Sequence, residues 1–93
     1  IVAEKAVRVG KWPSRITLRD TSSRWGSCSP NGRLSFSWRL VMAPMAVIDY
    51  VVVHELVHLQ EKNHSKSFWG KVKAIKPDYK QQIAWLKAWL AQN

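Results

Sequence analysis

The chain's three histidines have the clearest chemical potential, because all of them fall between positions 54 and 64. His54 and His58 are four residues apart, so on a helix they share one face with Cβ atoms about 5–6 Å apart. Two imidazoles so placed can bind one metal ion. Glu55 would be rotated by roughly 100° from His54 and would flank that ion without having to bind it. A carboxylate in this position suits a general base for metal-assisted hydrolysis.

A third ligand is expected, because zinc sites in enzymes usually have three protein ligands. His64 lies six positions after His58, and on an unbroken helix it would point roughly 240° away from that ligand. We therefore expect the helix to end before His64, with Asn63 as the stop, since asparagine tolerates the left-handed conformation. Asp78 is an alternative third ligand. The predicted centre is Zn²⁺ bound by His54, His58 and His64.

The chemistry expected of this centre is hydrolysis. Three neutral imidazoles leave zinc an open fourth position, where the pKa of water falls to about 7. Glu55 would take a proton from that water as it attacks a carbonyl carbon, and would deliver it to the leaving amine. The pattern predicts a zinc-dependent metallopeptidase that cleaves peptide bonds without a covalent intermediate. A zinc hydrolase of non-peptide amides is an alternative.

The first half of the chain must supply a sheet, because apolar and polar residues alternate in short segments. Ile16 and Leu18 would face the core from a half-buried strand. The Ser-Pro-Asn-Gly run at 29–32 is typical of a tight turn, so 24–38 is expected to form a hairpin. Strands are expected over 15–20, 24–29 and 33–38, with Leu34, Phe36 and Trp38 on one face of the last.

Helical spacing follows Pro44. A helix from Met45 to about Lys62 would carry His54 and His58. The β-branched run within it would by itself indicate a strand, but the histidine spacing favours a helix buried on most sides. Further helices are expected over 1–9 before Gly10, after an N-cap at Ser65, and from Pro77 and Asp78 onward.

These elements predict a single small α+β domain that spans 1–93. A small, mainly antiparallel sheet would pack on the central helix, with two further helices at the C-terminus. Because the chain begins with Ile1, we expect it to be the C-terminal part of a longer protein.

Composition narrows the class of protein. The longest run without a charged residue, 40–48, is too short for a membrane-spanning helix of about 20 residues. The single cysteine, Cys28, cannot form an internal disulfide, and we expect a cytoplasmic protein. The net charge of +9 favours acidic partners. It leaves open a second function class, a basic zinc-containing domain that binds nucleic acid and has no proteolytic activity.

The sequence alone leaves more than one role possible for several other side chains. Tyr50 and Tyr79 could stabilise an oxyanion or pack in the core, and Asp49 and Asp78 could support a ligand histidine. Cys28 is expected to be a small buried residue. Aromatic residues at apolar spacing could stack nucleic-acid bases, although core packing is favoured; these are Trp38, Phe68, Trp69, Trp85 and Trp89.

The motifs occur together from about residue 15 onward: His54-Glu55-Leu56-Val57-His58, His64-Ser65, Phe68-Trp69, Arg24-Trp25-Gly26-Ser27-Cys28-Ser29, Trp38-Arg39-Leu40, Tyr50-Val51-Val52-Val53 and Pro77-Asp78-Tyr79. Together they resemble the YgjP-like metallopeptidase domain family, which is similar to the SprT and WLM groups of zincin-like proteases. The resemblance implies a zinc-dependent hydrolase with His54, His58 and His64 as ligands and Glu55 as base. It also implies a minimal zincin-like fold and a peptide or protein substrate, added as a strand to a sheet edge for which the 24–38 hairpin is the candidate. The alternative for the motif at 24–29 is that it only supports the central helix.

Overall fold

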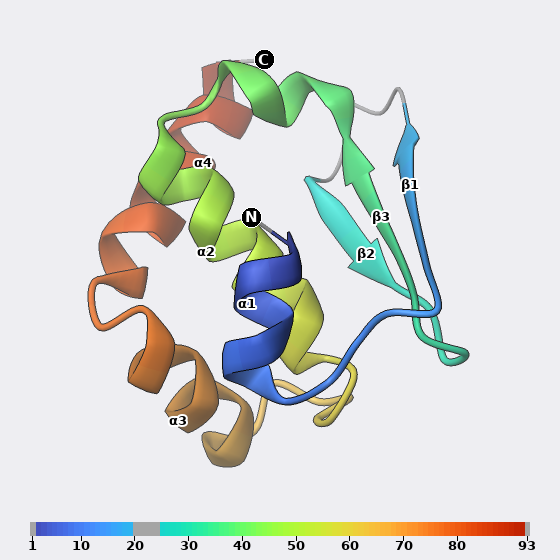
Figure 1. Ribbon diagram of the computed structural model, residues 1–93. Coiled ribbons are helices and arrows are strands. Elements are labelled where there is room, and N and C mark those ends of the chain that lie inside the picture. The colour runs from blue at the N-terminus through green and yellow to red at the C-terminus, as the bar shows by residue number, and fades with distance from the viewer. Residues whose placement is uncertain (1, 20–24, 93) are drawn as a thin grey trace.

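The computed structural model describes residues 2–19 and 25–92, and it has the expected α+β architecture, with the helices gathered on one side of a small sheet (Figure 1). The helices are α1 (Val2–Val9), α2 (Met45–Val57), α3 (Lys66–Ile75) and α4 (Tyr79–Gln92), with a short 3₁₀ helix η1 (Trp38–Met42) before α2. None of the described helices combines the length and the apolar character that crossing a lipid bilayer requires.

Among the residues that the structure describes, the sheet has three strands in the order β1-β3-β2. β2 (Gly26–Cys28) pairs with β3 (Arg33–Ser37) antiparallel, which confirms the predicted hairpin, whereas β1 (Arg15–Arg19) pairs with β3 in parallel. The expectation of a mainly antiparallel sheet is therefore correct only for the hairpin. β3 returns between the other two strands and so runs in the same direction as β1. The parts of the predicted strands at Asp20 and Arg24 lie outside the described residues.

The hairpin turn depends on one glycine. Gly32 has a φ of +84°, and its N–H donates to the carbonyl of Ser29 over 3.0 Å. Asn31 does not share the left-handed conformation, because no non-glycine residue among those described has a positive φ. The predicted turn is confirmed, with glycine alone carrying the unusual backbone angle.

The apolar face of β1 differs from the prediction of a half-buried strand. Ile16 and Leu18 are in register with Leu34 and Phe36 of β3, but they are 46% and 69% exposed whereas their β3 partners are buried. The cause is the position of β1 at the sheet edge farthest from the helices (Figure 1). Trp38 also differs from the prediction, because β3 ends at Ser37 and the Trp38 side chain, at the start of η1, is 44% exposed.

The central helix α2 lies between the sheet and the two C-terminal helices (Figure 1). Pro44 precedes its first residue, as expected, but the helix ends at Val57 rather than near Lys62. It is buried on most sides, which places its β-branched run in the core. The largest fully buried apolar side chains come from β3, α2 and α3: Leu34, Val47, Val53, Leu56, Val57, Phe68 and Val72.

The two C-terminal helices begin close to where the sequence predicts. Ser65 caps α3, since its Oγ accepts the N–H of Phe68 over 3.3 Å. In α4, Trp85 and Trp89 pack against Trp25, with ring centroids 6.2 and 4.4 Å away. These tryptophans therefore belong to the packing between α4 and the sheet.

Candidate metal centre

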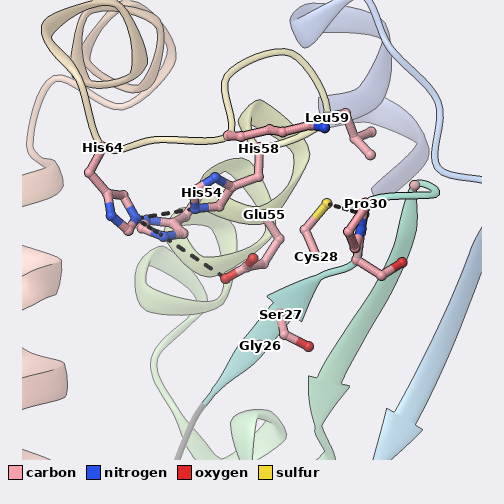
Figure 2. Close-up of a pocket in the computed structure, with 12 residues that line it drawn as sticks. Gly26, Ser27, Cys28, Pro30, His54, Glu55, His58, Leu59 and His64 are labelled. Atoms are coloured by element: carbon pink, nitrogen blue, oxygen red, sulfur yellow. Dashed lines mark hydrogen bonds and ion pairs between the residues drawn. The ribbon is translucent and has the colours of Figure 1, made fainter.

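The three histidines converge on one point beside β2 (Figure 2). Nε2 of His64 lies 3.1 Å from Nε2 of His58 and 3.3 Å from Nε2 of His54. Nitrogen ligands about 2.0–2.1 Å from a tetrahedral ion are about 3.3 Å apart, so both of these distances match that spacing, and the three ligand atoms all lie within 4.8 Å of one another. The trio could hold a metal ion, whereas Asp78, the alternative ligand, is hydrogen-bonded to Gln82 of α4.

His64 returns to the other two histidines because α2 stops early. The N–H groups of Leu59 and Gln60 donate to the carbonyls of Leu56 and Val57 at 3.0 and 2.9 Å, which forms a turn directly after the helix. The predicted break before His64 is confirmed. The predicted stop at Asn63 is wrong, because the helix has already ended and Asn63 has no positive φ.

Hydrogen bonds to the other ring nitrogens orient two of the histidines. Nδ1 of His58 lies 3.0 Å from the carbonyl oxygen of Glu61, so this nitrogen carries the hydrogen and donates. Nε2 of His58 is then left with its lone pair facing the other two rings. A ring nitrogen with a free lone pair is the form of histidine that binds a metal ion. The donor set therefore fits a metal ion.

Tyr50 supports His54 in the same way. Its hydroxyl lies 3.1 Å from Nδ1 of His54, and His54 follows Tyr50 by one turn of α2. The sequence prediction offered Asp49 and Asp78 for this supporting role, but Tyr50 supplies it. Its i, i+4 spacing from His54 is the signal that could have found it.

The electrostatics of the centre favour neutral imidazoles. Burial, reinforced by His58 and His64, lowers the pKa of His54 to about 3. Burial also lowers the pKa of His58 from its ordinary value. Neutral imidazole is the form that binds metal, so these rings need not lose a proton first.

Phe68 of α3 packs against all three imidazole rings. Its fully buried ring has its centroid 5.0, 4.5 and 4.9 Å from those of His54, His58 and His64. The neighbouring Trp69 stacks on the ring of His64 at 5.8 Å. Both aromatic residues therefore pack against the histidine rings and help to fix their positions. The sequence pattern offered only core packing or base stacking as roles for these two residues.

Glu55 lies next to the trio without joining it. Its Oε2 is 4.0 Å from Nε2 of His54, and the residue is only 7% exposed. β2 approaches it closely, because a Cβ on Gly26 would be 3.1 Å from Cγ of Glu55 and 3.1 Å from Cδ1 of Phe36. Glycine allows this approach without displacing a neighbour, which gives the upstream Trp-Gly-Ser-Cys motif a role beside the helix.

The trio and Glu55 open into a cavity of about 400 Å³ whose other wall is β2 and the turn after it (Figure 2). β2 is an edge strand and packs against α2. Cys28 lines the cavity half-buried, and burial together with the charge of Glu55 raises its pKa. A thiol that keeps its proton in this way is a poor nucleophile.

Comparisons with known proteins identify a family and a similar fold. The model of the family described as YgjP-like, metallopeptidase domain matches residues 1–89, which confirms the resemblance in the sequence. A structure of the metallopeptidase zymogen of Pyrococcus abyssi abylysin matches the fold with a TM-score of 0.84 at 20% identity, over 97% of this chain and 91% of that one. A protein of Escherichia coli (strain K12) named UTP pyrophosphatase is 40% identical over 50 residues, which are 54% of this chain and only 30% of that protein. The chain belongs to the YgjP-like metallopeptidase domain family.

Proposed function

We propose that this domain is a zinc-dependent peptidase in which His54, His58 and His64 bind the metal and Glu55 is the general base. The observation that carries the proposal is the convergence of three Nε2 atoms, at 3.1 and 3.3 Å, beside a buried carboxylate. Three imidazoles with one position open are a common ligand set for catalytic zinc. Membership of a metallopeptidase family supports the reaction class.

Each residue has a separate task in this proposal. Zinc, when bound, supplies Lewis-acid polarisation of a substrate carbonyl and lowers the pKa of water at its open position. Glu55 accepts the water proton at its carboxylate and delivers it to the leaving nitrogen. Tyr50 and the Glu61 carbonyl keep Nε2 of His54 and His58 directed at the metal through their hydrogen bonds to Nδ1.

The free edge of β2 would orient the substrate. An extended peptide that pairs with this edge gains main-chain hydrogen bonds and runs along the cavity that holds Glu55. The absence of a side chain at Gly26 leaves the backbone of β2 close to the carboxylate. A scissile carbonyl held there would lie beside both the histidines and the base.

The test is the Glu55→Gln variant. It should bind zinc as the wild type does but lose about 10²–10⁴-fold in peptide hydrolysis, because the amide cannot take the proton. Metal content by elemental analysis and cleavage of casein measure the two effects. Asp49→Asn, a matched loss of one carboxylate on the same helix, should leave both nearly unchanged. Undiminished turnover by Glu55→Gln would reject the general-base role.

A second candidate reaction is hydrolysis of a phosphoanhydride. The specific observation is the 40% identity over 50 residues to the Escherichia coli protein named UTP pyrophosphatase. The same metal ligands and Glu55 could direct water at phosphorus instead of carbon. The wild-type protein with zinc should be offered casein and UTP in parallel assays. Peptide cleavage without loss of UTP supports the peptidase; loss of UTP without peptide cleavage supports the second candidate and overturns the first.

A further inference from the structure

The face of the sheet opposite the helices is a polar surface, separate from the histidines of the metal centre. Its residues alternate with the apolar ones along β1 and β3, and they line an open hollow of about 830 Å³. We call this surface the arginine face; it consists of Arg15, Thr17 and Arg19 of β1, Arg33 and Ser35 of β3, and Ser27 of β2. Of these residues, only Ser27 also lines the cavity of the metal centre.

The charges on this face are arranged unfavourably for an isolated protein. Arg15 and Arg33 are register partners on neighbouring strands, so two exposed cations point from adjacent positions on the same face. Like charges directly opposite each other on a sheet destabilise the pairing. Within the part of the chain that the structure describes, no carboxylate forms an ion pair with Arg15, Arg19 or Arg33. An anion bound across them would remove the repulsion.

The arginine face adjoins the cavity of the metal centre. The two hollows share the stretch 27–30, which is the end of β2 and the start of the turn. A peptide that adds to the free edge of β2 alternates its side chains between the two faces of the sheet. Every second side chain of such a substrate therefore lies on the same face as the arginines.

The chemistry of the lining favours a polypeptide as the source of the anions. No aromatic side chain lines this hollow among the described residues, so it offers no platform for stacking nucleic-acid bases. A strand added at β2 would lie about 10 Å from β3 and about 14 Å from β1, given the spacing of strands. An arginine side chain on β3 and a glutamate side chain on the added strand can together bridge about 10 Å, and the planar guanidinium fork of arginine matches carboxylates. Arg15, the register partner of Arg33, adds positive potential at the same carboxylate.

We propose that the arginine face binds acidic side chains of the polypeptide substrate, so that the domain prefers extended substrates with Asp or Glu at alternate positions. The proposal rests on the peptidase function proposed above, since it assigns a substrate class to the same site. It makes Arg15 and Arg33 specificity-determining residues that act outside the metal centre.

Binding to the zinc-loaded Glu55→Gln variant tests this proposal without cleavage. Two labelled peptides are compared that differ only in Glu or Gln at alternate positions. The Glu peptide should bind at least about tenfold more tightly, and added salt should reduce the difference. Arg15→Gln with Arg33→Gln should abolish the preference. Lys73→Gln with Lys80→Gln removes the same charge from exposed positions on α3 and α4 and should leave the preference within about twofold.

Three results would overturn the proposal. The two double variants could weaken binding equally, which would make net charge the only cause. The Gln peptide could bind as tightly as the Glu peptide. Oligothymidylate or UTP could bind the arginines more tightly than the Glu peptide, which would assign the face to phosphate. Thermal melting of each double variant checks that it is folded.

Cleavage by the zinc-loaded wild-type protein separates this inference from the proposed function. If neither peptide is cleaved while the Glu preference in binding persists, the peptidase assignment fails and the anion-binding face stands. If both peptides are cleaved at equal rates and bound equally, the peptidase assignment stands and the arginine face is not a substrate site.

Discussion

At the scale of single residues, the position of Glu55 depends on the strand opposite it as well as on α2. Gly26 lets the backbone of β2 approach the Cγ of Glu55, and Phe36 closes the same space from β3. The carboxylate is thereby kept buried near Nε2 of His54. A base that must meet a substrate proton within about 3 Å needs such confinement.

Replacement of Gly26 by alanine should disturb this arrangement. The new Cβ would lie 3.1 Å from Cγ of Glu55 and 3.2 Å from the carbonyl oxygen of Ser35, which is a backbone atom and cannot move easily. We expect the free energy of unfolding to fall by about 1–3 kcal/mol and kcat for peptide hydrolysis to fall while zinc is retained.

Gly70→Ala is the matched control for that variant. Gly70 lies inside α3, and nothing would be within 4 Å of its Cβ, so alanine there should stabilise the helix by about 0.5–1 kcal/mol. Urea denaturation and metal content measure both variants. If Gly26→Ala has the same free energy of unfolding and the same kcat as the wild type, the close approach of β2 has no role in positioning Glu55.

At the scale of elements, α3 organises the metal centre from outside α2. Its cap, Ser65, follows His64 directly, and its first turn supplies Phe68 beneath the three imidazoles. Trp69 on the same turn stacks on His64. The start of α3 therefore determines where the last of the proposed ligands lies.

Ser65→Ala should weaken this start. It removes the acceptor for the N–H of Phe68, which typically costs about 1 kcal/mol of stability. Ser65→Asp should restore most of that loss, because aspartate is an equally good N-cap. Chemical denaturation of the three proteins gives the comparison, and equal stability of Ser65→Ala and the wild type would contradict the capping role.

The sequence could predict that the helix must break before His64, but it could not predict where. The residues at 59–62 have ordinary helix propensity, so nothing local marks the end of α2. In the folded chain, hydrogen bonds made by the residues from His58 onward hold the segment after α2 out of the helix. Nδ1 of His58 binds the carbonyl of Glu61, and the Gln60 amide donates to the Val9 carbonyl of α1 over 3.0 Å. A partner from 51 residues earlier in the chain cannot be found from local pattern.

At the scale of the whole molecule, the topology of the sheet separates two faces that the sequence pattern could not tell apart. Alternation correctly predicted that Ile16 and Leu18 share a face with each other, and Arg15 with Arg19. It could not show that β1 pairs in parallel with β3 at the edge far from the helices, which leaves the apolar face exposed and places Arg15 beside Arg33. Parallel pairing joins distant segments and leaves no local signal.

The exposure of β1 has a direct consequence for stability. Leu18→Thr should change the free energy of unfolding by less than about 0.5 kcal/mol, because Leu18 is 69% exposed and threonine suits a strand. Leu34→Ala, on the buried face of β3, should cost about 2–5 kcal/mol. Urea denaturation distinguishes the two, and a large loss for Leu18→Thr would mean that β1 is covered in solution.

The most direct test of the metal centre is the zinc content of the wild type and of His64→Ala, measured by elemental analysis after zinc loading and dialysis. The wild type should hold about one zinc ion per chain, and His64→Ala should retain well under half of it, because two imidazoles remain. Asn63→Ala, a matched change at the adjacent position, should bind zinc like the wild type. Equal zinc in His64→Ala and the wild type, or none in either, would contradict a centre built from these three histidines.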